Sequence, residues 1–507
     1  MEIKEELLKL INEDRLKVVE KLRELGIEPY PYSYEVTSFA KEIKERFEEM
    51  EGKEVSIAGR VISIREHGKS KFMDIRDSSG DIQVYLKKDL LEPVKRGEID
   101  CWKLTSYITT TDIIGVKGEV FKTKRGEISV RAKEIDIIAK ALTPIPFGKQ
   151  KGEQSWYAVT DPEVKYRNRY IYWNVYPKER EKIIQRERII SKIREFMNKK
   201  GFIEVSTPTL EILYGGAEAR PFETKIWALD WEKVYLRISP ELYLKRYIVG
   251  GFQKVYTICQ NFRNEGIDKY HYPEFTMMEW YEAFTDYNYQ MNQVEELLST
   301  IVKELFGTYK IKYQDREIDF APPFERMTIE DAITKFTSLD GKSATTEQLK
   351  KFLEENGIVW EGKEIRGFLI SEVFDKFCQE KIWNPTFIID HPKEISPLTK
   401  DHREKEGAVE RFELIIAGME IGNAYSELND PVEQFHRFQL QRELYIDAEV
   451  KHHPMDLDFI YALSCGMPPC GGVGLGIDRI IMILTDSASI RDVIGFPLLK
   501  PKIKEEK

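Results

Sequence analysis

Residues 262 to 281 combine side chains that could hold an anionic phosphate with side chains that could hold a cation. An apolar, strand-like run ends in Arg263 and Glu265, and a second run after a short polar loop carries Glu279 and Tyr281. A guanidinium can clamp a phosphate or a carboxylate through two parallel hydrogen bonds. Two antiparallel strands would gather these groups around one loop. A surface salt bridge between Arg263 and Glu265 is the simpler alternative.

Residues 411 to 427 place three glutamates on a predicted tight hairpin. If Ala417-Gly418 is a two-residue turn, Glu413 and Glu420 become diagonal neighbours on one face, within about 7–8 Å of each other. Two carboxylates so close repel unless a cation lies near them, and such oxygen ligands suit Mg²⁺ that bridges phosphates. Two solvated glutamates are the alternative. Strict alternation puts Glu427 on the opposite face from Glu420, so one pocket for both requires a β-bulge near Gly422-Asn423.

Two glycine-containing loops could approach a ligand closely. Residues 471 to 479 read Gly-Gly-Val-Gly-Leu-Gly-Ile-Asp-Arg and run into an apolar helix, so Arg479 would add positive charge for phosphate at a helix start. This spacing is neither a dinucleotide fingerprint nor a Walker A loop. Residues 215 to 222 read Gly-Gly-Ala-Glu-Ala-Arg-Pro-Phe and by themselves indicate a loop before a strand. Neither loop identifies a function alone.

The elements that must position these residues change character along the chain. Residues 3 to 25 have apolar side chains at helical spacing and predict an amphipathic helix, either solvated or leaning on nucleic acid. From residue 53 to 138 apolar and polar residues alternate with a period of two, which predicts β-strands. Short strands separated by turns fit a five-stranded barrel of the oligonucleotide-binding (OB) type. A helix is predicted over 183–197, and mixed helices and strands follow, which indicates an α+β class. Residues 325–381 look helical and poor in site-like residues, and predict an insertion.

One face of the predicted barrel could bind nucleic acid, because exposed aromatic rings stack on bases and basic groups contact phosphates. The alternative for Phe72 is a place in the barrel core. The candidate residues for this face are Arg65, Phe72, Gln83 and Glu127.

Composition is that of a soluble globular protein, with 42% hydrophobic and 32% charged residues among 507. No apolar run is long enough to span a membrane, and the N-terminus has no secretory h-region. The five scattered cysteines argue for a reducing compartment, and we expect a cytoplasmic protein. The net charge of −10 argues weakly against nucleic acid. Residues 52–143, however, carry more basic than acidic side chains. The local electrostatic field matters more for binding phosphates than the net charge of the whole chain.

Together these segments resemble the three motifs of the class II aminoacyl-tRNA synthetases. Helix–Phe202…Thr207-Pro208, Phe262-Arg-Asn-Glu265 and Gly474-Leu-Gly-Ile-Asp-Arg479 match the motifs in order and spacing. The barrel before this core is similar to that of the subclass with aspartyl, asparaginyl and lysyl members. Within that subclass, the runs at 215–222, 240–246 (Pro-Glu-Leu-Tyr-Leu-Lys-Arg) and 420–430 (Glu-Ile-Gly-Asn-Ala-Tyr-Ser-Glu-Leu-Asn-Asp) resemble the lysyl members.

The resemblance implies an α+β chain in which an OB-fold anticodon-binding barrel precedes a catalytic domain with an antiparallel sheet flanked by helices. The implied domains are an N-terminal helix over 1–30, the barrel over 31–145, a linker over 146–180 and the catalytic domain over 181–507, with an insertion at about 325–395.

The resemblance further implies ATP-dependent activation of L-lysine, its transfer to tRNA(Lys), Mg²⁺ and a homodimer. It implies catalytic roles for Arg263 and Arg479. ATP would be bound by Arg263, Glu265, His271, Phe275, Glu413 and Arg479, with Mg²⁺ on Glu413 and Glu420. Lysine would be bound by Gly216, Glu241, Arg263, Glu279, Tyr281, Asn423, Tyr425 and Glu427, and the anticodon by Arg65, Phe72, Gln83 and Glu127.

Some positions depart from the family pattern, and alternatives remain. Gln260 stands where a basic residue is frequent, Tyr425 where Phe is usual, and Cys470 where Thr is usual. A sister enzyme for aspartate or asparagine would need a basic residue for the substrate side chain, against which Glu427 argues. A non-catalytic relative that binds tRNA, or a paralogue that lysylates a protein, are further alternatives. The charged residues and the barrel argue against these two.

Overall fold

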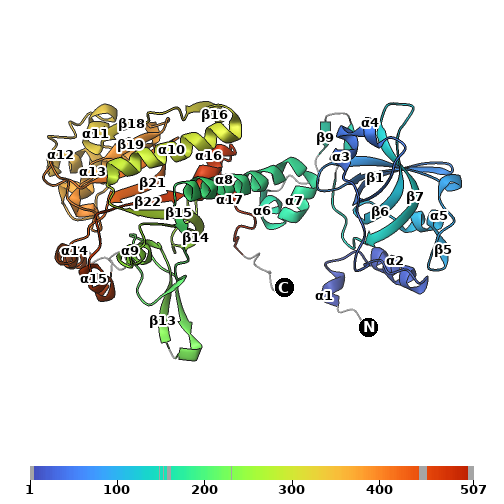
Figure 1. Cartoon of the computed structure of the whole chain (residues 1–507), viewed down its shortest axis with the longest axis horizontal. Coiled ribbons are helices and arrows are strands. Elements are labelled where there is room, and N and C mark those ends of the chain that lie inside the picture. The colour runs from blue at the N-terminus through green and yellow to red at the C-terminus, as the bar shows by residue number, and fades with distance from the viewer. Residues whose placement is uncertain are drawn as a thin grey trace. The chain divides into compact units, whose positions relative to one another are not determined.

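The computed structural model divides into two compact units, residues 1–177 and 178–507 (Figure 1). The finer domain boundaries expected from the sequence stay predictions. The residues that the structure describes are 5–147, 149–151, 154–156, 162–229, 231–444 and 454–500.

The first unit is built on a closed barrel with the strand order β1-β2-β3-β7-β6, which confirms the predicted OB-type fold. The strands β2 and β3 bury every second residue, as period-two patterning predicts. Met73, Val84 and Leu86 point inward and are fully buried. The barrel strands are β1 (Glu54–His67), β2 (Ser70–Arg76), β3 (Asp81–Lys87), β6 (Ile113–Lys122) and β7 (Ile128–Ala139).

The N-terminal segment forms two helices, so the prediction of one continuous helix was wrong. The helical conformation is interrupted before α2 because the Asn12 side chain caps that helix. It accepts a hydrogen bond from the backbone N–H of Arg15 at 3.0 Å. Leu22 is buried in the barrel core, and Gly26, with φ of +72°, follows the helix. The shorter elements of this unit are α1 (Glu5–Leu8), α2 (Glu13–Glu24), α3 (Ala40–Glu45), α4 (Phe47–Met50), β4 (Lys95–Arg96), β5 (Ile99–Asp100), α5 (Cys101–Leu104), β8 (Lys149–Lys151), β9 (Gln154–Trp156), α6 (Pro162–Arg167) and α7 (Arg169–Val175).

The second unit is built on an eight-stranded sheet with the order β10-β14-β15-β22-β21-β20-β19-β18. The central strands are antiparallel, as predicted, but the two outer pairs are parallel. A parallel pair needs a crossover, and helices of the predicted insertion connect β18 to β19. The strands are β10 (Ile203–Glu204), β14 (Lys254–Phe262), β15 (Glu274–Ala283), β18 (Glu325–Thr328), β19 (Thr386–Ile389), β20 (Arg411–Ile416), β21 (Met419–Ser426) and β22 (Cys470–Gly476).

Helices and small sheets surround this sheet (Figure 1). The helices are α8 (Arg180–Lys199), α9 (Glu241–Val249), α10 (Tyr287–Phe306), α11 (Ile329–Phe336), α12 (Thr346–Glu355), α13 (Arg366–Phe377), α14 (Pro431–Leu444), α15 (Leu457–Ser464), α16 (Ile477–Leu484) and α17 (Ile490–Val493). The small sheets contain β11 (Leu210–Glu211), β12 (Glu223–Ile226), β13 (Trp231–Leu236), β16 (Lys310–Tyr313) and β17 (Arg316–Asp319).

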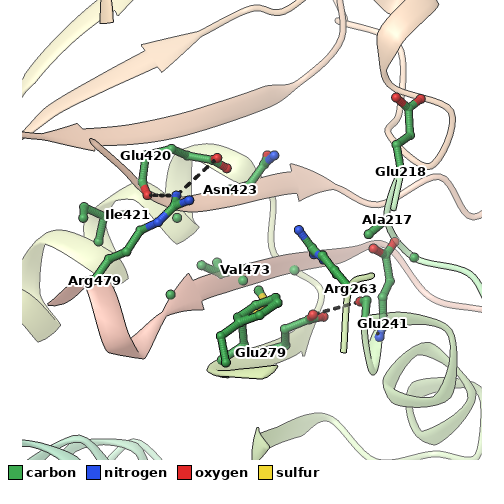
Figure 2. Close-up of a pocket in the computed structure, with 18 of the residues that line it drawn as sticks. Ala217, Glu218, Glu241, Arg263, Glu279, Glu420, Ile421, Asn423, Val473 and Arg479 are labelled. Atoms are coloured by element: carbon green, nitrogen blue, oxygen red, sulfur yellow. Dashed lines mark hydrogen bonds and ion pairs between the residues drawn. The ribbon is translucent and has the colours of Figure 1, made fainter. Parts of the chain in front are cut away.

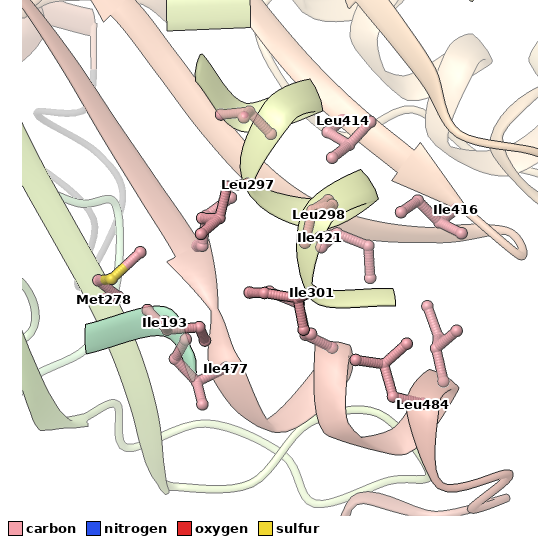
Figure 3. Close-up of a cluster of buried hydrophobic side chains, with 14 of the residues drawn as sticks. Ile193, Met278, Leu297, Leu298, Ile301, Leu414, Ile416, Ile421, Ile477 and Leu484 are labelled. Carbon is pink, nitrogen blue, oxygen red and sulfur yellow. The ribbon is translucent and has the colours of Figure 1, made fainter. Parts of the chain in front are cut away.

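One face of the large sheet is sealed by α8, α10 and α16, which bury a single apolar cluster against it (Figure 3). Met278 of β15 and Leu414 of β20 meet Leu297 of α10 and Ile477 of α16 within that cluster. Truncating one such side chain to alanine costs about 2–5 kcal/mol, because the cavity left behind relaxes only in part. Since strand residues alternate, the neighbours of these core residues must point to the opposite face of the sheet.

In the part of the chain that the structure describes, no helix is long and apolar enough to cross a membrane.

Candidate functional site

The face of the sheet opposite the helices is hollowed into a cavity of about 370 Å³. The strand β15 shows why: Met278 and Trp280 are buried in the helix-covered core, while Glu279 and Tyr281 line the cavity. Most of the site residues expected from the sequence meet here. They are Gly216, Glu241, Arg263, Glu265, His271, Phe275, Glu279, Tyr281, Glu420, Asn423, Tyr425 and Arg479.

Two arginines mark the two ends of this cavity (Figure 2). Arg263 lies beside Glu241 and Glu279 at one end, and its guanidinium is 5.1 Å from the ring of Phe275. Burial lowers the pKa of Arg263, which three nearby carboxylates oppose. A buried guanidinium of this kind is suited to bind an incoming anion, whose charge would oppose the effect of burial.

The second arginine, Arg479, is held by two contacts at the other end. Its Nη1 donates to the backbone oxygen of Glu420 at 2.6 Å, and its Nη2 lies 3.0 Å from Nε2 of His271. His271 Nδ1 lies 2.8 Å from Asp268 Oδ2, which fits the tautomer with the proton on Nδ1. His271 and Arg479 are therefore fixed as a pair on the rim, where negative charge could be received.

The loop at Gly216 closes over the start of α9. Gly216 has φ of +83°, and a Cβ built there would fall 2.8 Å from Oγ of Ser239 and 2.9 Å from Cβ of Glu241. Both the left-handed backbone and the close approach require glycine. The loop can thus lie directly on the residues that begin the helix.

Glu279 is the best-anchored carboxylate of the cavity. It accepts hydrogen bonds from Ser239 Oγ at 2.9 Å and from the Tyr281 hydroxyl at 3.3 Å. Burial, and next the charge of Glu241, raises the pKa of Glu279 to about 8. An ammonium group entering the cavity would lower that pKa and favour the ionised form, so Glu279 is suited to bind a cation.

The hairpin of β20 and β21 contains the bulge that the sequence required. Ala417 and Gly418, both with positive φ, form the turn as predicted. The pairing then shifts between Ile415 and Leu414, so that one extra residue is accommodated in β21. As a result Glu420 and Asn423, three residues apart, both line the cavity. The bulge lies next to Gly422, close to where the sequence required it, but it does not bring Glu427 into the same cavity as Glu420.

The expected metal ligands meet in a second cavity and not in the first. Glu413 lines a second, larger cavity of about 1090 Å³, and Glu420 lines both. Burial, and next the charge of Glu413, raises the pKa of Glu420. Glu372 and Asp375 of α13 also line the second cavity, so the predicted insertion is richer in site-like residues than expected. Among the described residues, no group of three or more acidic, histidine or cysteine side chains forms a metal site.

Glu427 lines neither of these two cavities. Its side chain is fully buried, and its Oε2 lies 2.5 Å from Nζ of Lys245 on α9, which is also fully buried. Lys245 Nζ lies equally close to Oε1 of Glu241. The family resemblance predicts Glu427 at the site, whereas nothing in the sequence singles out Lys245. A lysine four residues after a glutamate on a helix looks like a solvated ion pair.

Two further residues, which the sequence did not single out, hold the expected site residues in place. Arg411 donates to Asn423 Oδ1 at 3.2 Å and to Glu413 Oε1 at 2.6 Å, so it ties both strands of the hairpin together. Asp478 accepts a hydrogen bond from the backbone of Thr276 at 2.7 Å and pairs with Arg186 of α8. It thereby fixes the start of the helix that carries Arg479.

The residues expected to bind nucleic acid lie on or beside the outer face of the barrel. Arg65 pairs with Phe72 across β1 and β2, and it also forms an ion pair with Asp74 at 3.0 Å. Gln83 accepts from Ser129 Oγ at 3.2 Å. Glu127 is exposed just before β7. Phe72 is only half-buried on this outer face, so it is not barrel core.

Three aromatic or basic side chains extend that face beyond the expected set. The ring of Phe72 lies 4.9 Å from that of Tyr85, and Tyr85 lies 5.9 Å from Phe121. The guanidinium of Arg131 stacks on Phe121 at 4.5 Å. The alternation of β3 contained the signal for Tyr85, because it follows the outward Gln83 by two residues.

Comparisons with known proteins agree with this geometry. Residues 161–500 match the family described as tRNA synthetases class II (D, K and N), and residues 55–138 match the OB-fold nucleic acid binding domain family. The chain is 47% identical over 506 residues to a lysine–tRNA ligase of Thermotoga maritima, covering 99% of this chain and 98% of that protein.

Similar relatives occur in other bacteria. A lysine–tRNA ligase of Fervidobacterium nodosum is 47% identical over 98% of this chain and 95% of its own length. A lysine–tRNA ligase of Carboxydothermus hydrogenoformans is 46% identical, and the match covers 96% of this chain and 97% of that protein. With a three-motif site on an antiparallel sheet and a nucleic-acid-binding barrel before it, this chain belongs to the class II tRNA synthetases of the D, K and N group, within the lysine–tRNA ligase family.

Proposed function

We propose that the chain activates L-lysine with ATP, forming lysyl-adenylate and pyrophosphate, and then transfers lysine to the 3′ end of tRNA(Lys). The observation that carries the proposal is a buried, carboxylate-rich pocket beside a partly desolvated arginine. Glu241 and Glu279 line one end of the cavity next to Arg263. A cationic amino acid could satisfy the carboxylates while its own carboxylate meets the arginine.

The chemistry requires no protein nucleophile. The lysine carboxylate attacks the α-phosphorus of ATP in line, the bond to the β-phosphate oxygen breaks, and pyrophosphate leaves. Both reactants are anionic at the point of attack, and Arg263 is placed to hold the two together. Catalysis then rests on positioning and on charge neutralisation. Arg479, fixed against His271 at the far end, offsets charge on the departing pyrophosphate.

The remaining ATP contacts follow from the same cavity. Phe275 offers a ring face for the adenine base, and Glu265 and His271 lie on the rim beside it. Glu413 and Glu420 would hold Mg²⁺. Two carboxylates fit this ion because it usually keeps waters and takes its other ligands from substrate phosphates. When bound, Mg²⁺ would neutralise phosphate charge.

The selection of lysine depends on a buried carboxylate that needs a cationic partner. Glu427 carries two buried oxygens without a hydrogen bond of good geometry. Lys245 forms an ion pair with one of these oxygens, and leaving the other without a cationic partner is costly, so an apolar amino acid would be rejected. A site that pairs with a polar substrate group can reject analogues lacking it by ~10⁴. Ornithine is harder to exclude, because one methylene is worth about 1–3 kcal/mol.

We also propose that the barrel face binds the anticodon and that the chain acts as a cytoplasmic homodimer. Stacked rings beside Arg65 and Arg131 suit single-stranded bases and phosphates. Between residues 203 and 213, four large apolar side chains are exposed. Such exposed apolar side chains, if they form one patch, are typical of an interface. These side chains are Ile203, Leu210, Ile212 and Leu213.

Exchange of labelled pyrophosphate into ATP, measured with each amino acid in turn, tests the central proposal. We expect exchange with lysine, weaker exchange with ornithine and essentially none with aspartate or asparagine. Aspartate-dependent exchange would replace the proposal with that of a sister enzyme. The absence of exchange with every amino acid would indicate a non-catalytic relative.

A further inference from the structure

A buried cation lies behind the amino-acid end of the cavity and contacts Glu241, which lines it. Lys245, from the second turn of α9, extends into the protein between Glu241 and Glu427, with its Nζ 2.5 Å from one oxygen of each. The side chains of Lys245 and Glu427 have no exposed surface, and that of Glu241 is 5% exposed. The ring of Phe459 lies 5.9 Å from the ammonium and helps to exclude water.

The charges of this cluster do not cancel. Glu241, Glu279 and Glu427 are all buried, and Lys245 can neutralise one of them. Burial by itself would lower the pKa of Lys245, but the charges of Glu241 and Glu427 raise it above its ordinary value, so the side chain is ammonium. Burial raises the pKa of Glu427 to about 8, which the charge of Lys245 opposes. When both glutamates are ionised, the cluster of Glu241, Lys245 and Glu427 carries one net negative charge, and a second ammonium group beside it would favour that state.

The remaining charge is directed toward the cavity. Lys245 approaches Oε2 of Glu427, which leaves Oε1 without a donor. A Cβ built on Gly472 would fall 2.1 Å from that Oε1 and 2.4 Å from the ring of Tyr281. Gly472 and Tyr281 both line the cavity, so the unpaired oxygen lies directly behind its wall. An oxygen in that position lacks only a cationic donor.

We propose that Lys245 is a positioning residue for substrate selection: it holds Glu427 in place through Oε2, cancels one of two carboxylate charges and leaves Oε1 for a single ammonium group. The inference rests on the proposed activation of lysine. It explains how the pocket can bury two acidic side chains and still match a substrate side chain of one positive charge. Without Lys245, two uncompensated carboxylates would repel, and Glu427 would lose its orientation.

The test uses Lys245→Met, which keeps the length of the side chain and removes its charge. In lysine-dependent pyrophosphate exchange we expect the lysine KM to rise by ~10-fold or more, since a buried charge pair loses one partner. The KM for ATP should change far less. Lys254→Met is the matched control, because Lys254 pairs with buried Glu282 at 2.7 Å outside the cavity. A lower lysine KM in Lys245→Met would mean that Lys245 competes with the substrate, which would overturn the proposal.

A double-mutant cycle separates positioning from a purely structural role. Glu427→Gln removes the group on which Lys245 acts, and the double variant Lys245→Met/Glu427→Gln leaves neither charge, which favours folding if the single variant is unstable. We expect Lys245→Met to change the lysine KM by less than ~3-fold in the Glu427→Gln background. Equal factors in both backgrounds would show that the two residues act independently and would overturn the proposal.

The outcomes also separate this inference from the proposed function. If the unmodified chain shows no lysine-dependent exchange, both are wrong. If the unmodified chain activates lysine and Lys245→Met has an unchanged lysine KM, only the role of Lys245 is wrong. Thermal unfolding of each variant, followed by circular dichroism, shows whether a loss of exchange reflects unfolding.

Discussion

At the scale of single residues, the charge of Glu427 is the feature on which amino-acid selection depends. Glu427→Gln keeps the shape of a fully buried side chain and removes the charge that pairs with Lys245. We expect the lysine KM to rise at least ~30-fold, as for other buried charged contacts, with a much smaller change in the ATP KM. Pyrophosphate exchange at varied lysine and ATP measures both constants.

The matched control for this prediction is Glu274→Gln, because Glu274 is an exposed glutamate at the start of β15. Its two KM values should stay as they are. Equal increases of both KM values in Glu427→Gln would show that the side chain supports the whole cavity rather than the amino acid.

Residue types and spacing singled out only some of the groups that line the cavity, and the family resemblance supplied the others. Arg263 and Glu279 stand out because a core does not need charged residues at the end of a strand or within one. Lys245 does not, since its helix also reads as an ordinary amphipathic one and its partner Glu427 is distant in sequence. Burial of an ion pair depends on tertiary contacts that local patterns do not contain.

At the scale of elements, the alternating residues of β2 and β3 divide into two sets. One set packs in the barrel interior, and the other presents aromatic rings on the outer face, where bases could stack. Phe72→Ala removes a ring that lies 4.9 Å from Tyr85 on that face. We expect the tRNA KM in aminoacylation to rise roughly 5- to 100-fold, since stacking is worth about 1–3 kcal/mol per base. Lysine-dependent exchange should be unchanged, because the cavity lies in the other unit.

The control for the barrel face is Tyr32→Ala, which removes a fully exposed ring of the same unit away from the barrel strands. Aminoacylation by this variant should match that of the unmodified chain. Loss of exchange in Phe72→Ala would mean that the ring supports folding.

Elements with strict alternation were predicted well, and those decided by one local contact were not. The barrel strands followed from period two. The break before α2 depends on the cap at Asn12, which the pattern of apolar residues does not contain. The bulge in β21 was expected near Gly422-Asn423 only because two glutamates were to share a pocket. It lies beside Gly422, where a Cβ would fall 2.3 Å from Leu475, and this contact is not visible in the pattern of β21.

At the scale of the whole molecule, the exposed apolar segment at residues 203–213 is the feature that favours assembly. Ile212 is 61% exposed, and a charge there would be buried in any interface that covers the segment. We expect the unmodified chain to sediment as a dimer and Ile212→Glu to shift it toward monomer, because an unpaired buried charge costs several kcal/mol. Analytical ultracentrifugation measures the equilibrium.

Val359→Glu serves as the control, since Val359 is 78% exposed in the predicted insertion, far from that segment in sequence. It should leave the sedimentation unchanged. If Ile212→Glu sediments like the unmodified chain, the apolar segment is not the interface.

The protonation of Lys245 also affects whether the enzyme acylates its own side chains. An aminoacyl-adenylate is an acylating agent, and an unprotonated lysine near it would be acylated by it. Because Glu241 and Glu427 raise the pKa of Lys245, its nitrogen has no free lone pair and is not a nucleophile. After turnover without tRNA, peptide mass spectrometry should find self-lysylation on exposed amines such as Lys269, and none at Lys245. The same two carboxylates would thus bind the substrate and protect the protein from its own product.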